Sequence, residues 1–174
     1  MSDFITNTKN KLTYAYAPKK YELGTFASTE ITTANTNSTL ATHSANTLKA
    51  ADQIRIAYSA SVDNQSGNNE DFTFTLVLGG SSFPRTLTIT DGNADTVGIT
   101  ADLTRINATS FFAQVNFIHI EDDGTITSYP VVSIVDDVDV TECTVTAENE
   151  SVVSAGCDLV GEGGYLVVDT FEIN

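Results

Sequence analysis

The chain of 174 residues carries 23 acidic residues against eight lysines and arginines, a net charge of −15, and only 18% of its residues are charged. This length suits one domain with a small extension, which can bury a core without a metal or a disulfide framework. So acidic a surface repels phosphate backbones and anionic lipid heads, and we expect neither nucleic acid nor a membrane surface as a partner.

The first 22 residues differ from the remainder in charge. They hold four lysines and two acidic residues, a net charge of +2, which leaves −17 on the rest of the chain. No sustained helix or strand period runs through residues 1–23, so we expect an extended N-terminal arm there and a domain over residues 24–174. A flexible, solvated terminus is the alternative. Tyrosines of such an arm can anchor on a partner while lysines steer the encounter, and the predicted partner-binding residues are Lys9, Lys11, Tyr14, Tyr16, Lys19, Lys20 and Tyr21.

The start of the chain, MSDFITNTKNKL, lacks the apolar stretch of a signal peptide, and no apolar run approaches the roughly 20 residues that span a bilayer. We therefore expect a soluble protein made without an export signal. In that setting Cys143 and Cys157 are expected to be reduced, half-buried thiols. A disulfide between them is the alternative, and it would close a loop of about 15 residues.

Short alternating runs, bounded by polar turn clusters, follow from Gly24 onward. Residues 54–62 and 72–78 each place apolar side chains at every second position, which predicts two strands with one buried face. The polar connection between them, residues 63–71, predicts a hairpin with a long loop. Gly79 and Gly80 predict the turn that ends the second strand. The next runs are residues 87–89 and 97–99, around a turn at residues 91–93.

Residues 110–121 are apolar on both faces. One face carries Phe111, Ala113, Val115 and Phe117, and the other carries Phe112, Ile118 and Ile120. Such a strand is expected in the middle of a packed assembly, covered by the core on one side and by something else on the other. A turn at residues 122–124 and runs at residues 125–135, 143–147 and 165–173 follow. Eight to ten strands without a helical stripe predict an all-β, antiparallel β-sandwich of the jelly-roll type.

No arrangement of residues indicates catalysis or a cofactor. The chain has no Gly-x-Ser-x-Gly elbow, phosphate loop or dinucleotide fingerprint, and nothing in its spacing selects a pair of carboxylates for glycoside cleavage. His119 lies on the Phe111 face of its strand, where a satisfied imidazole is expected rather than a base. We therefore expect a protein that is not an enzyme and that has no cofactor.

Asp91, Asn93, Asp95 and Asp102 have the spacing of a calcium loop, although Thr96 stands where that loop needs glycine. Turn chemistry explains the same residues without a metal. The acidic cluster of Asp136, Asp137, Asp139 and Glu142 is expected to be a solvated loop, or to receive the lysine arm of a neighbour.

Residues 45–80, ANTLKAADQIRIAYSASVDNQSGNNEDFTFTLVLGG, resemble a module of bacteriophage virion proteins. In that module an NTL-x-x-G-D-x-I-R-I segment leads into a strand, a polar loop follows, and a T-F-T-L-x-L-G-G strand comes next. Ala51 stands where the pattern often has glycine. The positions that match are Asn46, Leu48, Asp52, Ile54, Arg55, Ile56, Phe74, Leu76, Leu78, Gly79 and Gly80.

The resemblance implies a jelly-roll virion component, such as a capsid decoration (cement) protein or a head- or tail-fibre domain, of a kind that often forms trimers. With the charge partition, it predicts a decoration protein made in the host cytoplasm and located on the outer surface of a phage head. Its expected partners are the major capsid protein and further copies of itself in a homotrimer. The rival prediction is a receptor- or glycan-binding fibre module that uses the loop at residues 63–71, although the lack of tryptophan argues mildly against glycans.

Overall fold

The computed structural model describes residues 18–31, 37–44, 51–136, 142–150 and 156–169, and most of them lie in β-strands. No helix of this part of the chain is long and apolar enough to cross a membrane. The strands in chain order are β1 (Lys19–Leu23), β2 (Phe26–Ile31), β3 (Asn37–Ser44), β4 (Gln53–Asn64), β5 (Glu70–Leu78), β6 (Ser81–Ile89), β7 (Ala94–Asn107), β8 (Ser110–Ile120), β9 (Ile126–Asp136), β10 (Glu142–Asn149) and β11 (Cys157–Asp169).

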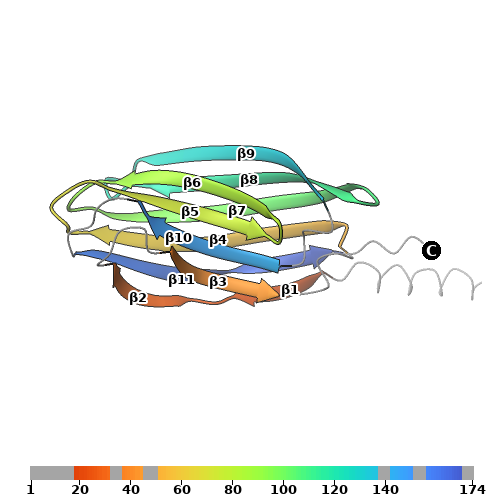
Figure 1. The fold of residues 1–174 in the computed structure, drawn as a ribbon, viewed down its shortest axis with the longest axis horizontal. Coiled ribbons are helices and arrows are strands. Elements are labelled where there is room, and N and C mark those ends of the chain that lie inside the picture. The colour runs from red at the N-terminus through yellow and green to blue at the C-terminus, as the bar shows by residue number, and fades with distance from the viewer. Residues whose placement is uncertain (1–17, 32–36, 45–50, 137–141, 151–155, 170–174) are drawn as a thin grey trace, which may run out of the picture.

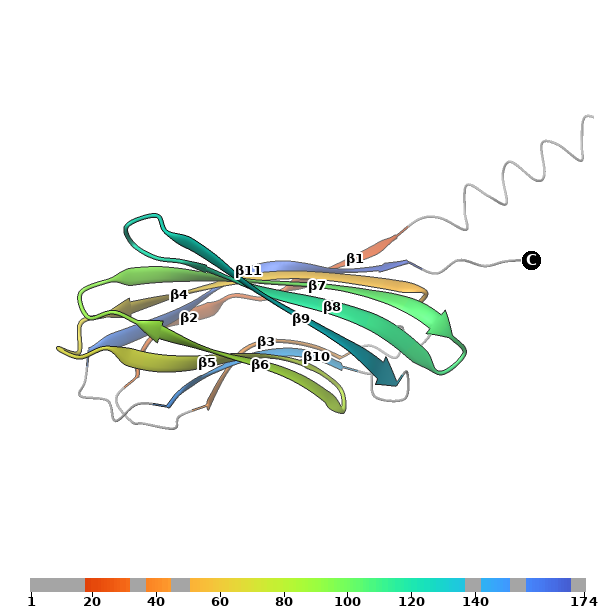
Figure 2. The same ribbon diagram turned by 90° about the horizontal axis from the view of Figure 1, so that it is seen from above.

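Two antiparallel sheets face each other (Figures 1 and 2). The smaller sheet has the order β3-β10-β5-β6, and the larger has the order β1-β11-β4-β7-β8-β9, with β2 also paired to β11. Without β1, β8 and β9, the order β2-β11-β4-β7 opposes β3-β10-β5-β6. These connections are those of a jelly roll. The predicted fold class, an antiparallel β-sandwich of the jelly-roll type, is confirmed.

The larger sheet has three strands, β1, β8 and β9, in addition to its four jelly-roll strands. At one edge, β1 and β2 follow each other along β11. At the other edge, β8 and β9 form a hairpin beyond β7, closed by a turn in which Gly124 has a φ of 85°. β9 pairs with β8 and, within the described residues, with no further strand. In Figure 1, β9 lies at the upper margin and β2 lies at the lower one.

The core lies between the sheets and is built from every second residue of the facing strands. In β5, Phe72, Phe74, Leu76 and Leu78 are all fully buried, as their alternation predicts. The larger sheet contributes the same pattern. Its large, fully buried side chains are Ile54, Ile99, Leu103, Phe111, Phe117 and Leu159.

The prediction that residues 54–62 and 72–78 form a hairpin is wrong. The first run is in β4, which pairs with β7 and β11 of the larger sheet, and the second is in β5, which pairs with β6 and β10 of the smaller sheet. The polar connection therefore crosses between the two sheets, which pack about 10 Å apart. Alternation of apolar residues shows only that each strand buries one face. It does not show which of the two sheets the strand belongs to. The turn at Gly79 does join a hairpin, β5–β6, and Gly79 has a φ of 58° there.

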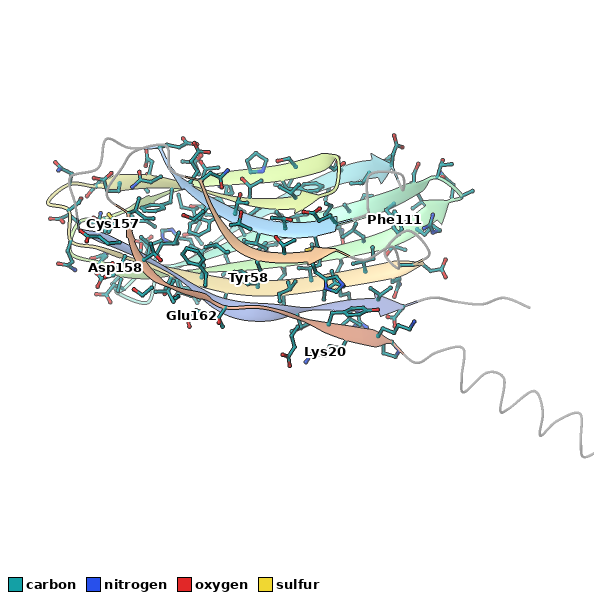
Figure 3. The ribbon with its side chains drawn as sticks, turned by 60° about the horizontal axis from the view of Figure 1, so that its bottom comes forward. Lys20, Tyr58, Phe111, Cys157, Asp158 and Glu162 are labelled. Carbon is teal, nitrogen blue, oxygen red and sulfur yellow. The ribbon has the colours of Figure 1, made fainter. Side chains whose placement is uncertain are left out.

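A bulge in β11 lets this strand pass close to Tyr58 of β4. The pairing of β11 with β4 shifts register between Gly161 and Gly163, and Gly163 has a φ of 97°. A Cβ atom on Gly161 would overlap the Tyr58 hydroxyl, and one on Gly164 would overlap the Ala57 carbonyl oxygen. In return, the Tyr58 hydroxyl donates a hydrogen bond of 3.2 Å to the Leu40 carbonyl of β3, which ties the two sheets together (Figure 3).

We expect Gly164→Ala to destabilise the domain by about 2–3 kcal/mol, because the new methyl group meets backbone that cannot rotate away. Gly98→Ala is the matched control. Gly98 lies in β7 of the same sheet, and a Cβ there meets only the Ile118 side chain and backbone oxygen, at 3.6 and 3.9 Å. Its melting temperature should match or slightly exceed that of the parent. Equal melting curves for the two variants would contradict the close backbone approach at Gly164.

Candidate interaction surface

Three of the seven predicted partner-binding residues lie in β1, at an edge of the larger sheet. Lys19, Lys20 and Tyr21 pair with Val168, Val167 and Leu166 of β11. Lys9, Lys11, Tyr14 and Tyr16 lie outside the described residues. The last residues of the expected arm are therefore a strand of the sandwich, while the segment before residue 18 carries the other four positions.

The three residues of β1 face two ways. Lys19 and Lys20 are exposed, and the Lys20 Nζ lies 4.9 Å from the centre of the Tyr165 ring on the outer face of the sheet. Tyr21 is half-buried, and the centre of its ring lies 4.5 Å from the centre of the His43 ring of β3. Tyr21 thus helps to close the sandwich, and a part of its surface is already used within the molecule.

A basic and aromatic corner surrounds Lys20 on this outer face. Val167 of β11 pairs with Lys20 on one side and with Arg55 of β4 on the other, so these two cations lie in one row across the sheet. Arg55 bonds to Asp169 at 3.1 Å and keeps 53% of its side chain exposed. Tyr165 is 41% exposed. The corner, defined as Lys20, Arg55 and Tyr165, offers two cations and one aromatic ring on an otherwise acidic molecule.

Arg55 and Tyr165 were not predicted as contact residues. Arg55 stands in an alternating run and Tyr165 in a terminal strand, so each reads as an ordinary outward-facing residue of its strand. Only the pairing of β1 with β11, and of β11 with β4, brings them beside Lys20. Long-range pairings of this kind leave no local signal.

His119 makes a buried contact that explains its presence without catalysis. Its Nε2 lies 2.8 Å from an Asp95 carboxylate oxygen, and both side chains are almost fully buried. The other oxygen of Asp95 accepts a hydrogen bond of 3.1 Å from the Asp122 backbone N–H. The pair thus fixes the β8–β9 turn onto the start of β7. The prediction of a satisfied, partly buried imidazole is confirmed.

The residues with calcium-loop spacing do not converge. Asp95 points into the core toward His119, whereas Asp102 is exposed on the outer face of β7. Asp91 accepts a hydrogen bond of 2.8 Å from the Gly67 backbone N–H. Within the described residues, no group of three or more histidine, cysteine, aspartate and glutamate side chains could hold a metal ion.

The predicted acidic cluster is described only at its ends. Asp136 is the last residue of β9 and Glu142 the first of β10, and both are exposed. Asp137 and Asp139 lie outside the described residues. The two ends agree with a solvated acidic loop.

The two cysteines are free thiols, as predicted in preference to a disulfide, and both are fully buried rather than half-buried. Burial, followed by the charge of Glu142, raises the pKa of Cys143 to about 12. Burial and the charge of Glu70 raise the pKa of Cys157 to about 11, and its Sγ donates to the Asn64 side-chain oxygen at 3.2 Å. Neither thiol is therefore a nucleophile at neutral pH.

The loop between β4 and β5 is ordered by its own hydrogen bonds. The fully buried Asn64 donates to the carbonyls of Asn68 and Ile89, at 2.8 and 2.9 Å. The β6–β7 turn is tied to the same loop, because the Gly92 N–H donates to the Asn64 carbonyl at 2.7 Å. Gln65 and Asn68 remain exposed at its tip. The loop predicted for the rival function is thus a fixed polar surface at one end of the sandwich.

No protein-family model and no curated protein sequence matches the chain. Solved structures with a similar arrangement include that of infectious bursal disease virus, Gx strain, at 12% identity and a TM-score of 0.39. That match covers 88% of this chain and 32% of the viral one, so the chain spans about a third of that protein. The CBM2 module of the evolved Dit of Lactobacillus casei BL23 phage J-1 matches with 12% identity and a TM-score of 0.42, over 83% of this chain and 77% of the module. The jelly-roll assignment rests on the strand order described above.

We expect both thiols to resist alkylation in the folded protein. Iodoacetamide at pH 8 should modify neither Cys143 nor Cys157 within an hour, since each is buried and protonated, while both should react in denaturant. Intact mass spectrometry counts the adducts. Rapid modification of the native protein at either thiol would contradict the burial described for it.

Proposed function

We propose that the protein is a non-enzymatic virion component, a capsid decoration protein that binds the outside of a phage head and stabilises it. In this proposal the major capsid protein is its partner, copies of the chain form a homotrimer, and the N-terminal segment makes the attachment. The chain is made in the host cytoplasm and joins the particle there.

The observation that carries the proposal is the uneven charge of the chain. The first 22 residues have a net charge of +2 against −17 for the remainder, and their lysines continue into β1, where Lys19 and Lys20 are exposed at the sheet edge. The corner of Lys20, Arg55 and Tyr165 adds a further cation and an aromatic ring beside that edge. A basic segment leaving an acidic body at an accessible edge suits attachment to an acidic surface.

The resemblance to phage virion proteins supports the same role. The described part of the similar segment, residues 51–80, runs through β4, crosses between the sheets and continues through β5 to the Gly79 turn. It therefore includes one strand from the middle of each sheet and the connection between them. That segment forms the centre of a jelly roll, the fold that the resemblance implies.

A receptor- or glycan-binding fibre module is the second candidate, and one observation favours it. The loop between β4 and β5 is held by Asn64 and by the β6–β7 turn, so its exposed residues are ordered before any ligand arrives. Such ordering lowers the entropy lost on binding. Against it, the loop tip presents no aromatic side chain, and aromatic platforms are what usually stack on sugar faces.

We expect deletion of residues 1–17 to leave the β-fold intact but to abolish loading onto particles stripped of this protein. The deletion ends before β1, so the pairing with β11 and the contact of Tyr21 with His43 are kept. Replacing Lys9, Lys11, Lys19 and Lys20 by glutamine should weaken loading mainly at low salt, where screening is least. Co-sedimentation measures loading, and circular dichroism checks the fold. Equal loading of the truncated and full chains would overturn the arm as the attachment.

The number of copies per virion separates the two candidate functions. Quantitative mass spectrometry of purified particles, normalised to the major capsid protein, should find hundreds of copies if the protein decorates the head. A few copies would identify a fibre or tail component and would overturn the decoration proposal. In that case Asn68→Asp at the loop tip becomes the informative variant for host attachment, since its side chain is exposed.

A further inference from the structure

The large hydrophobic side chains that remain exposed are gathered on one side of the described molecule. Among seven such residues, Tyr165 alone lies apart from the others, beside Lys20 near the opposite edge of the same sheet. Three of the others expose more than 60% of their surface, with values of 66%, 62% and 66% for Ile126, Val132 and Ile134. The remaining members are Ile106, Phe112 and Ile120.

Strand register places five of these residues on the outer face of the β8–β9 hairpin, and Ile106 lies near the end of β7. Phe112 pairs with Ile134, and Ile120 pairs with Ile126. Their neighbours Phe111 and Val135 are buried in the core, so alternation directs the exposed residues to the opposite side. Within the described chain nothing covers this face, as the exposure of Ile126, Val132 and Ile134 shows, and no strand continues the larger sheet beyond β9 (Figure 1). We call this surface the β8–β9 outer face.

The β8–β9 outer face carries little of the acidic charge of the chain. β8 contains no lysine, arginine, aspartate or glutamate, and His119 points inward to Asp95. The single charged residue of β9 is Asp136, at its end. In a chain with a net charge of −15, two copies can approach through this face with less like-charge repulsion than elsewhere, with Asp102 of β7 and the turn residues Asp122 and Asp123 only at its margins.

The chemistry of the face also suits a permanent partner. Interfaces that stay closed resemble a core cut in half, whereas transient ones are about as polar as the remaining surface. Monomers rarely expose contiguous apolar patches of more than a few hundred Å². The occupant that this chemistry favours is a second copy of the chain, because an apolar face with little charge can meet the same face of a copy while the acidic surfaces stay apart.

The proline in β9 favours packing through the face over pairing through the strand edge. Pro130 has no N–H, and prolines in sheets occur on edge strands that are not continued by another strand. The two strands of the face, of 11 residues each, cover about 360 Å² in projection at about 3.4 Å per residue and about 4.8 Å between strands.

We propose that the β8–β9 outer face is the surface through which copies of this chain associate, with the same face from each copy meeting around a closed symmetry axis. This inference rests on the proposed function only in that it assigns the surface of the homotrimer proposed there. Its test needs no capsid, so the two can fail separately.

The full chain is expected to elute as a closed oligomer at micromolar concentration, with a mass by light scattering that is a small multiple of 18.6 kDa. Ile134→Asp and Ile134→Lys should both shift the mass to that of the monomer. Aspartate adds negative charge to an acidic chain and could separate the copies by repulsion, whereas lysine lowers the net negative charge. Loss of association with both variants therefore shows that the apolar contact of Ile134 holds the copies together. Ile134 is 66% exposed, so both variants should keep the circular dichroism spectrum and melt of a folded domain.

Ser82→Asp is the matched control. Ser82 is exposed on β6 of the smaller sheet, so the substitution adds the same charge to a strand on the opposite side of the molecule. It should leave the oligomer unchanged. A monomeric full chain, or an oligomer that survives both Ile134 variants, overturns the inference. A full chain that forms the oligomer yet fails to load onto particles overturns the proposed function and leaves this inference standing.

Discussion

The two sheets of this sandwich differ in their number of strands, seven against four. This difference decides which apolar residues the core can cover. Four strands of the larger sheet are matched by the four of the smaller one, and β8 and β9 extend the larger sheet past that match. β8 still buries Phe111 and Phe117 under the edge of the smaller sheet. β9 lies further out, where the Arg85 guanidinium of β6 stacks 3.7 Å from the centre of the Tyr129 ring. The added hairpin thus has a core on one side and uncovered apolar residues on the other.

Much of the fold could be predicted from alternation, because a strand that buries one face records it at every second residue. The runs in β4, β5 and β8 were found in this way, as were the glycine turns after β5 and β8. β1, β2 and β3 were missed. β1 is short and begins with two exposed lysines, and β2 carries four exposed residues in succession. Edge strands pack on few neighbours, so their sequences keep little of the alternation.

Surfaces made by several strands could be predicted only where one strand carried the signal. The second apolar face of residues 110–121 indicated something outside the core, and the structure does place Phe112 and Ile120 on an exposed face. Ile126, Val132 and Ile134 gave no such signal, since their importance comes from pairing with β8. The corner at Lys20 has the same origin, because β11 has to lie between β1 and β4 before Arg55 joins it.

The two surfaces that matter for the proposals lie at opposite edges of one sheet. β1, with the corner of Lys20, Arg55 and Tyr165, is at one edge, and the uncovered hairpin is at the other (Figure 1). Three strands, β11, β4 and β7, lie between β1 and β8, which places these two strands about 20 Å apart at ordinary strand spacing. A copy that joins its neighbours through β8 and β9 therefore keeps β1 free to face another protein. Because a sheet is stiff, association at one edge also sets the direction in which the other edge points, so self-association would present several basic segments toward one surface. Linked attachments of this kind bind far more tightly than single ones when the geometry allows all of them to engage at once.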